Sequence, residues 1–230
     1  SCLATADHRW YIETRARAGK HVRLVRTTDR LKSNHRIIVA APAESGSHPF
    51  TAREAAVLGW LVTDGTIYFG GTSKAQGFIY QSKPQRVAEL RHLLDGISTE
   101  RLDTRTSASS PDVGRTLTRT TPGIRFYLRQ SFFRPLLERA NYTGPHSLIP
   151  LITQLSTEAR TAMLNAMLAA EGTQDKNGTW RFAQNRGPVL EAFLLLATLE
   201  GHRLGRMTPV GPRAVTVSPM QRRRFATVAD

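Results

Sequence analysis

One pattern occurs twice in this chain of 230 residues, and it restricts the fold more than any other feature of the sequence. Residues 57–65 read Val-Leu-Gly-Trp-Leu-Val-Thr-Asp-Gly, and residues 164–172 read Leu-Asn-Ala-Met-Leu-Ala-Ala-Glu-Gly. Each copy is an apolar stretch with a small residue in its middle (Gly59 or Ala166), and each ends with an acid and a glycine. A repeated segment of this kind predicts two equivalent structural units in one chain.

The residues around both copies predict helices. Thr51 and Glu54 form a capping box ahead of the first copy, and Ser156 is a cap ahead of the second. The final glycine of each copy predicts the end of the helix, because glycine readily takes the left-handed conformation. The small residues predict that the two helix backbones pack closely against each other.

The pattern around the two copies predicts the order helix, hairpin, helix and strands in both halves. In the first half we expect strands at 66–69 and 77–81, a helix at 84–94, loop at 95–114, strands at 115–120 and 124–128 joined by a turn at 121–123, and a helix at 132–140. In the second half we expect a hairpin over 173–184, a helix at 189–199 and a strand at 214–217. Residues 8–42 contain short β-rich runs, and the turn-rich residues 42–49 predict a boundary.

Asp64 and Glu171 are acids at the C-terminal ends of their helices, where the helix dipole disfavours a negative charge. Close packing of the two helices would bring both carboxylates together, and they would repel each other unless a cation joined them. A divalent ion with oxygen ligands, Mg²⁺ (or Mn²⁺), removes this conflict and activates water for attack on a phosphodiester. The alternative is that each acid is a solvated residue at a helix end.

The charge of the chain points to a polyanionic partner. The sequence has 32 lysines and arginines against 18 acids, which gives a formal net charge of +14. Such a balance is typical of nucleic-acid binding, although a GC-rich genome also favours arginine over lysine. One cysteine excludes an internal disulfide, and the absence of a signal-peptide pattern or a long apolar run favours a cytoplasmic protein without a membrane partner.

At the two acid-glycine segments the sequence resembles the LAGLIDADG homing endonucleases that carry two motifs on one chain. The resemblance covers roughly residues 50–230. It implies an α+β fold of two pseudo-symmetric αββαββα halves, at 50–155 and 156–230, with a β saddle on double-stranded DNA. It also implies a monomer that makes a metal-dependent double-strand break at a long recognition site.

The resemblance also implies the residues of the catalytic site. Asp64 and Glu171 would bind the metal, and the backbone carbonyls of Thr63 and Ala170 would add ligands. Gln81 and Gln184 would order water near the metal, with Ser82 and Asn185 as rivals one position further on. Ordinary strand polarity is the alternative explanation of these glutamines.

The sequence departs from the family at two positions. The second acid is a glutamate, and Ser147 stands where the family often has a lysine, with His146 next to it. If that lysine stabilises charge, the chain is a slow enzyme or a DNA-binding protein that does not cleave, such as a maturase.

A second resemblance covers residues 1–43. Thr5-Ala-Asp-His8 is similar to a short block of the Hint splicing domain of inteins, which often carry endonucleases, and Thr5 and His8 would be its splicing-like residues. We find no suitable nucleophile before this block and no terminal asparagine, so we expect the middle of an intein, or a free-standing relative, that does not splice as it stands. An intein fragment without endonuclease activity is the remaining alternative.

The residues that would read DNA follow from the alternation of side chains along the strands, which the resemblance places in the major groove. The run Arg222–Arg224 is expected to bind phosphate instead. The candidates for DNA contacts are Thr66, Tyr68, Thr72, Lys74, Lys83, Arg115, Arg119, Arg125, Arg129, Lys176, Arg181, Arg186, Arg206 and Arg213.

Binding of duplex DNA should weaken steeply as salt concentration rises, because each phosphate that the protein neutralises releases a counterion. The slope of log affinity against log salt should be about −0.9 for each phosphate contacted. Fluorescence anisotropy over a series of KCl concentrations measures this slope. A slope near zero would contradict the expectation of a basic DNA-binding surface.

Overall fold

The computed structural model describes residues 9–15, 21–32, 36–38, 45–69, 75–108, 118–176, 180–204, 208–210, 214–217, 219–220 and 225–227. The element order of residues 52–139 is α1 (Ala52–Thr63), β4 (Gly65–Tyr68), β5 (Gln76–Gln81), α2 (Pro84–Leu93), β6 (Ser98–Ala108), β7 (Thr118–Leu128) and α3 (Gln130–Arg139). A connection follows with η3 (Pro145–Ser147) and α4 (Leu148–Gln154). The next elements are α5 (Thr157–Glu171), β8 (Gly172–Gln174), β9 (Trp180–Gln184), α6 (Pro188–Leu199), β10 (Arg203–Leu204), β11 (Thr208–Val210), β12 (Ala214–Val217) and β13 (Pro219–Met220).

Two antiparallel sheets of four strands have the same internal order. The first sheet is β4-β5-β7-β6, and the second is β8-β9-β12-β11, so in both the fourth strand lies between the second and the third. Their hairpins also share a register, because Gly65 lies opposite Ile79 and Gly172 lies opposite Phe182. The fold is therefore a mixture of helices and antiparallel sheets in which one arrangement occurs twice.

Helices α1 and α5 pack directly against each other through their small residues. A Cβ atom on Gly59 would lie 2.8 Å from the carbonyl oxygen of Met163 and 3.0 Å from the Cβ of Ala166. No side chain larger than hydrogen fits at such a separation without a shift of the backbone. The predicted close packing of the two helices is confirmed, and Gly59 and Ala166 lie at their contact.

A pair of equivalent arginines holds each of these helices to the helix that follows its hairpin. Arg160 follows Arg53 by 107 residues, the same interval that separates Ala166 from Gly59. Arg53 donates to the carbonyl oxygens of Leu93 and Asp95 at the end of α2. Arg160 is buried and forms an ion pair of 3.0 Å with Glu200 at the end of α6. A cation is favourable at both places because the helix dipole is negative there.

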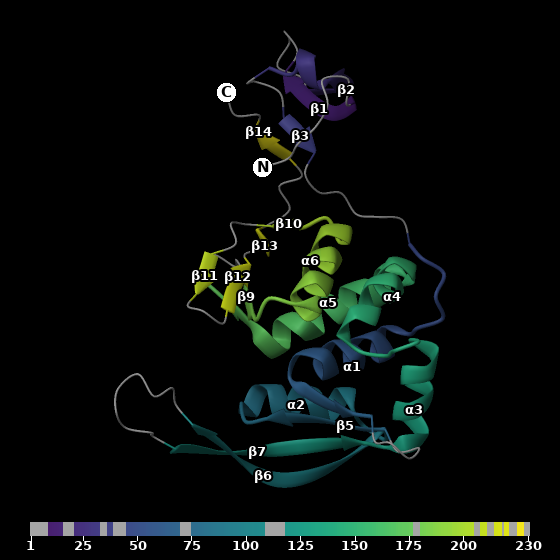
Figure 1. Cartoon of the computed structure of the whole chain (residues 1–230), viewed down its shortest axis with the longest axis vertical. Coiled ribbons are helices and arrows are strands. Elements are labelled where there is room, and N and C mark those ends of the chain that lie inside the picture. The colour runs from purple at the N-terminus through teal and green to yellow at the C-terminus, as the bar shows by residue number, and fades with distance from the viewer. Residues whose placement is uncertain are drawn as a thin grey trace.

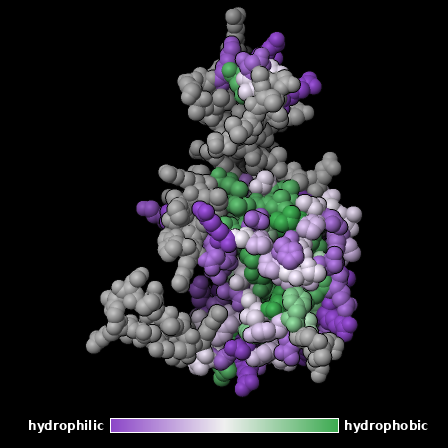
Figure 2. All heavy atoms as spheres, in the orientation of Figure 1, coloured by the Kyte–Doolittle hydropathy of each residue, from purple (hydrophilic) through white to green (hydrophobic). Residues whose placement is uncertain are grey.

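The helices cover one face of the first sheet and leave the other face open. Helices α1 and α2 lie on the same side of the sheet (Figure 1). Ile79 and Phe126 point toward them and are fully buried, whereas Tyr68 and Arg101 on the opposite face are exposed. Apolar atoms show on the viewed surface mainly over α5 and α6, with hydrophilic residues around them (Figure 2). Among the helices of the described residues, none has the length and apolar character that a membrane span needs.

The structure corrects two expectations for residues 95–128. Residues 98–108 of the predicted loop form β6, and residues 118–128, which include the predicted turn, form one continuous strand, β7, that pairs with β6 along its whole length. The sequence of β6 is polar on both faces because much of this ribbon extends beyond the helices, as the 85% exposure of Leu102 shows. Pro122 is tolerated because β5 ends at Gln81, opposite Ile124, so no strand lies on that side to receive its missing N–H.

The reason for the two acid-glycine sequences also differs from the prediction. Neither Gly65 nor Gly172 takes the left-handed conformation, and Gly172 has a φ of −85°. Instead, a Cβ atom on Gly65 would lie 2.5 Å from the carbonyl oxygen of Leu61, and one on Gly172 would lie 2.3 Å from that of Leu168. Both glycines are needed because the chain turns from helix to strand directly over the last helical turn.

The described part of the N-terminal segment is β-structured, as predicted. Strands β1 (Arg9–Arg15), β2 (His21–Thr27) and β3 (Arg36–Ile38), with η1 (Thr28–Arg30), lie at one end of the molecule (Figure 1). The fourth strand of their sheet is β14 (Phe225–Thr227), which pairs with β3. The last strand therefore lies in the N-terminal sheet, whereas the sequence assigned residues 156–230 as a whole to the second half.

Replacement of Gly59 by leucine should lower the free energy of unfolding by about 1–3 kcal/mol, because the added side chain overpacks the contact with Met163 and Ala166. Thermal and urea unfolding of the purified protein measure the change. Ala88→Leu on the exposed face of α2 is the matched control, with a larger residue but no helix contact. Equal stability of the two variants would show that α1 and α5 do not meet at Gly59.

Candidate catalytic and nucleic-acid-binding site

The two acids occupy equivalent positions on the packed helix pair. Asp64 is the residue that caps the C-terminal end of α1, and Glu171 is the last residue of α5. Each lies five residues beyond the small residue at the helix contact, which corresponds to about 7.5 Å along a helix axis. Both are partly exposed, so solvent and ligands can reach them. This equivalence follows from the two repeated sequences and from the contact between Gly59 and Ala166.

Gln81 is held beside Asp64 by three hydrogen bonds. Its amide nitrogen donates to Oδ2 of Asp64 at 3.0 Å. Its amide oxygen accepts the N–H groups of Ser82 and Lys83, both at 3.0 Å. The residue is 5% exposed although it is polar. Gln81, rather than its rival Ser82, is therefore the side chain that contacts and orients the Asp64 carboxylate.

Gln184 repeats one part of this arrangement in the second half. Its amide oxygen accepts the N–H group of Asn185 at 2.9 Å, as that of Gln81 accepts the N–H of Ser82. It ends β9 as Gln81 ends β5, and it is half-buried. The strand order places both glutamines at the strand end that leads into the next helix, α6 or α2.

The donors around the acids are oxygen atoms, which suit a hard divalent cation. Asp64 and Glu171 supply carboxylates, and the last carbonyls of each helix, those of Thr63 and Ala170 among them, lack partners within the helix. No cluster of three or more His, Cys, Asp or Glu side chains that could hold a metal occurs in the described ranges. A metal ion at this place would therefore need backbone carbonyls, water or bound phosphate in addition to the two acids.

The open face of the first sheet carries the residues that alternation predicted for β4. Thr66 lies opposite Phe78 in the ladder, and Phe78 lies opposite Tyr127. The ring of Phe78 is 6.1 Å from that of Tyr68 and 5.6 Å from that of Tyr127. The three rings form a patch on this face, which we call the aromatic patch (Tyr68, Phe78 and Tyr127).

Arg125 lies on the same face, and both terminal nitrogens of its guanidinium already have partners, whereas its Nε is buried without one. Its guanidinium lies 4.4 Å over the ring of Phe78, donates to the hydroxyl of Tyr127 at 3.1 Å and forms an ion pair with Asp103. The hydrogen bond to Tyr127 raises the pKa of Arg125, and the charge of Asp103 acts in the same direction. Arg125 therefore packs the aromatic patch together, and little of its hydrogen-bonding capacity is left for a base.

Several predicted DNA-binding residues are exposed on the surface. Lys83 and Arg186 follow the two glutamines, Lys176 follows β8, Arg181 is in β9, and Arg129 precedes α3. In the second hairpin Arg181 takes the ladder position that Phe78 has in the first. The backbone of Arg119 lies in β7 opposite Ser107. The predicted residues outside the described ranges are Thr5, His8, Thr72, Lys74, Arg115, Arg206, Arg213 and Arg222–Arg224.

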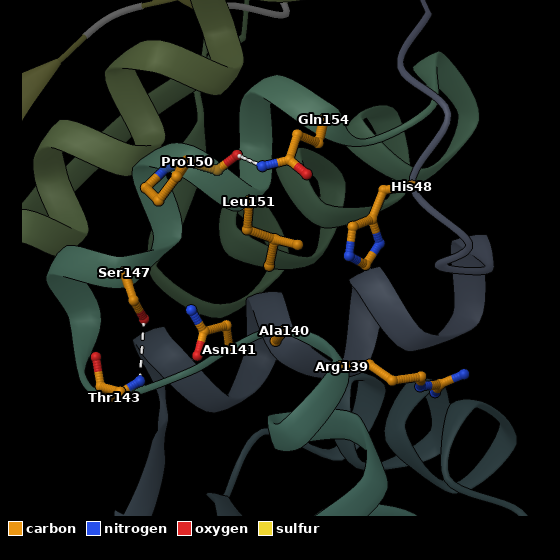
Figure 3. Close-up of a pocket in the computed structure, with 9 residues that line it drawn as sticks. All are labelled: His48, Arg139, Ala140, Asn141, Thr143, Ser147, Pro150, Leu151 and Gln154. Carbon is orange, nitrogen blue, oxygen red and sulfur yellow. Dashed lines mark hydrogen bonds between the residues drawn. The ribbon is translucent and has the colours of Figure 1, made fainter.

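Ser147, at the position where a lysine was expected, is engaged within its own turn. Its hydroxyl donates to the carbonyl of Gly144 at 2.7 Å and accepts the N–H of Thr143 at 3.2 Å. It lines a pocket of about 280 Å³ between the end of α3, α4 and the segment at His48 (Figure 3). Neither of the two acids lines this pocket, so it is separate from the candidate catalytic site. His146 is exposed and lies 3.4 Å from the hydroxyl of Thr143.

The sequence analysis missed Phe78 and Tyr127 as surface residues of the open face. Both lie in strands that also contain core residues, Ile79 and Phe126, so an aromatic residue there gave no sign of its direction. The alternation that predicted Thr66 and Tyr68 would have identified Phe78 had the register of the hairpin been known.

Comparisons with known proteins give only distant matches. No protein-family model matches the chain, and no curated protein matches its sequence. A mesophilic variant of the homing endonuclease I-DmoI is similar in structure, with a TM-score of 0.46, 15% identity and coverage of 75% of this chain and 90% of that chain. The homing endonuclease I-WcaI bound to its DNA recognition sequence is similar with a TM-score of 0.48, 8% identity and coverage of 75% of this chain and 77% of that chain. Full-length DUF199/WhiA from Thermatoga maritima is similar with a TM-score of 0.45, 9% identity and coverage of 75% of this chain and 53% of that chain. Because these TM-scores lie below 0.5, function has to be inferred from the residues and contacts of this chain.

Replacement of Gln81 by leucine should destabilise the protein by about 1 kcal/mol, because the partly buried N–H groups of Ser82 and Lys83 lose their acceptor. Chemical denaturation measures the effect, with Gln85→Leu on the exposed side of α2 as the matched control. If both variants unfold at the same denaturant concentration, the side chain of Gln81 does not hold these backbone groups.

Proposed function

We propose that this protein is a site-specific DNA endonuclease that makes a metal-dependent double-strand break. The observation that carries the proposal is the equivalence of Asp64 and Glu171, each five residues beyond the contact of Gly59 with Ala166. In this proposal a pseudo-twofold axis runs between α1 and α5 and relates the halves at 50–155 and 156–230. Two equivalent acids suit a substrate with two antiparallel strands, since each strand has one scissile phosphate.

The residues of the chain would act as follows. Asp64 and Glu171, with the carbonyls of Thr63 and Ala170, would hold Mg²⁺ or Mn²⁺, which when bound lowers the pKa of water and stabilises charge on the phosphate. Gln81 donates to Oδ2 of Asp64, which holds this carboxylate in place. Gln184 is oriented by the N–H of Asn185 toward the corresponding role in the second half. Lys83 and Arg186, next to these glutamines in the sequence, would bind the adjacent phosphates.

Duplex DNA is the polyanion that fits the two sheets. Each sheet has an antiparallel order with one side directed away from the packed helices, and a two-stranded ribbon fits the major groove. The net charge of +14 supplies the attraction for phosphate. With both halves on one chain, we propose that the protein acts as a monomer on DNA in the cytoplasm.

A second candidate function is DNA binding without cleavage, as in a maturase. The observation that favours it is that Ser147 is engaged by Gly144 and Thr143, so this position supplies no cation to a scissile phosphate. A cleavage assay separates the two functions.

We also propose that residues 1–43 belong to a partial splicing domain of the Hint type. The pairing of β14 with β3 supports it, because the segments on both sides of the two halves then meet in one sheet. A splicing assay on the chain in its natural flanking sequence tests this origin independently of DNA cleavage.

The proposed function is tested by incubating the protein with its host gene, from which the inserted sequence that encodes the protein has been removed. We expect a double-strand break near the insertion point in Mg²⁺ and none in EDTA. Binding to this DNA without a break in either Mg²⁺ or Mn²⁺ would favour the binding protein instead.

Asp64→Asn and Glu171→Gln should each lower the cleavage rate at least 100-fold and leave DNA affinity within a few-fold, because each removes a charge that holds the metal and leaves the basic surface intact. Rates on a linear duplex and affinities in EDTA provide the two measurements. Glu158→Gln, an exposed acid on the same helix as Glu171, is the control and should cut at the wild-type rate. Wild-type cleavage by either of the first two variants would rule out this site.

A further inference from the structure

The two hairpins present different chemistry at the same place in the same ladder. Phe78 lies opposite Thr66 in the first hairpin, and Arg181 lies opposite Thr173 in the second. The register of both hairpins is otherwise equal, so Phe78 and Arg181 occupy corresponding positions on the two sheets. An aromatic ring and a guanidinium cannot recognise the same base edge.

The first sheet offers an apolar surface at this place. Tyr68 lies in the edge strand and is 57% exposed. Its ring lies next to that of Phe78, which in turn lies next to that of Tyr127. Arg125, the cation closest to these rings, is held by Tyr127 and by Asp103, whose carboxylate offsets its charge. A ligand that lies on the aromatic patch therefore meets three aromatic rings, and the cation beside them is already paired with Asp103.

The second sheet offers a charged surface at the corresponding place. Arg181, the second residue of β9, is exposed, and Lys176 is exposed beyond the end of β8. A guanidinium presents two parallel N–H donors that fit the N7 and O6 acceptors of guanine, whereas the thymine edge presents a methyl group that fits an apolar surface.

We infer that the two sheets read different bases, the first recognising thymine through its methyl group at the aromatic patch, and the second recognising guanine through Arg181. This inference rests on the proposed binding of duplex DNA and specifies how it occurs. The recognition site is therefore not palindromic in chemistry, although the two halves of the protein share one fold. One half-site needs a methyl group on its pyrimidine, and the other needs the acceptors of a purine.

Base analogues test the inference with the full chain in EDTA, so that bound DNA is not cut. Duplexes are first selected for binding from a random pool, and each position of a selected site is then replaced singly. Deoxyuridine replaces thymidine and removes only the methyl group, and 7-deazaguanine replaces guanine and removes only the N7 acceptor. We expect a loss of about fourfold at one or two thymines in one half-site, and of about tenfold at one or two guanines in the other.

Two variants of exposed residues assign the effects and serve as controls for each other. Tyr68→Ala should abolish the difference between thymine and uracil and keep the 7-deazaguanine effect. Arg181→Ala should abolish the 7-deazaguanine effect and keep the preference for thymine. Selected sites that bind equally well with uracil at every position, or whose analogue effects do not respond to these variants, would overturn the inference and leave the proposed DNA binding intact. A failure to select any duplex would overturn the proposed function and this inference with it.

Discussion

The contact between Gly59 on α1 and Ala166 on α5 is the constraint on which the rest of the structure depends. A Cβ atom at residue 59 would lie only 3.0 Å from that of Ala166, so the two helices pack too closely at this point for any side chain at residue 59. The first strand of each sheet follows directly from one of these helices, at Gly65 or Gly172, and each glycine comes immediately after one of the two acids. The separation of the helices therefore sets both the separation of the acids and the separation of the two sheets.

The equivalence of the halves is strongest near this contact and weakens away from it. Arg53 and Arg160 occupy equivalent sequence positions, and each joins its helix to the helix that follows the hairpin. Arg53 does so through backbone carbonyls, whereas Arg160 binds the carboxylate of Glu200. The ion pair of Arg160 with Glu200 is buried, and burial of charged groups is costly unless they are paired and hydrogen-bonded. Arg160 also donates to the carbonyl oxygen of Leu155 and to the hydroxyl of Thr157. At the corresponding ladder position the first hairpin has Phe78 and the second has Arg181, so the side-chain chemistry differs there although the register is the same.

The sequence predicted the parts of the fold that local chemistry determines. The capping box at Thr51 and Glu54, the cap at Ser156 and the apolar helices are all present. The sequence did not predict β6, because a polar strand on an open ribbon shows no alternation of apolar and polar residues. It also did not predict that β7 is continuous, because Pro122 and Gly123 suggested a turn. Asp64 could be predicted as a site residue from its place at a helix end, and Gln81 only through the family resemblance, but the hydrogen bond that joins them depends on the sheet register. The engagement of Arg125 by Asp103 also required the structure, because it joins two strands whose pairing the sequence did not reveal.

The pairing of β3 with β14 has a consequence for how the chain tolerates change. This sheet closes a loop that contains the described α-helices and the other two four-stranded sheets. The entropy cost of closing a loop grows only with the logarithm of its length, by about 0.6 kcal/mol for each doubling. The pairing of β3 with β14 is therefore almost insensitive to the length of the segment between these two strands. The enclosed halves can gain or lose whole loops over evolution at little cost to the sheet that joins the two flanking segments.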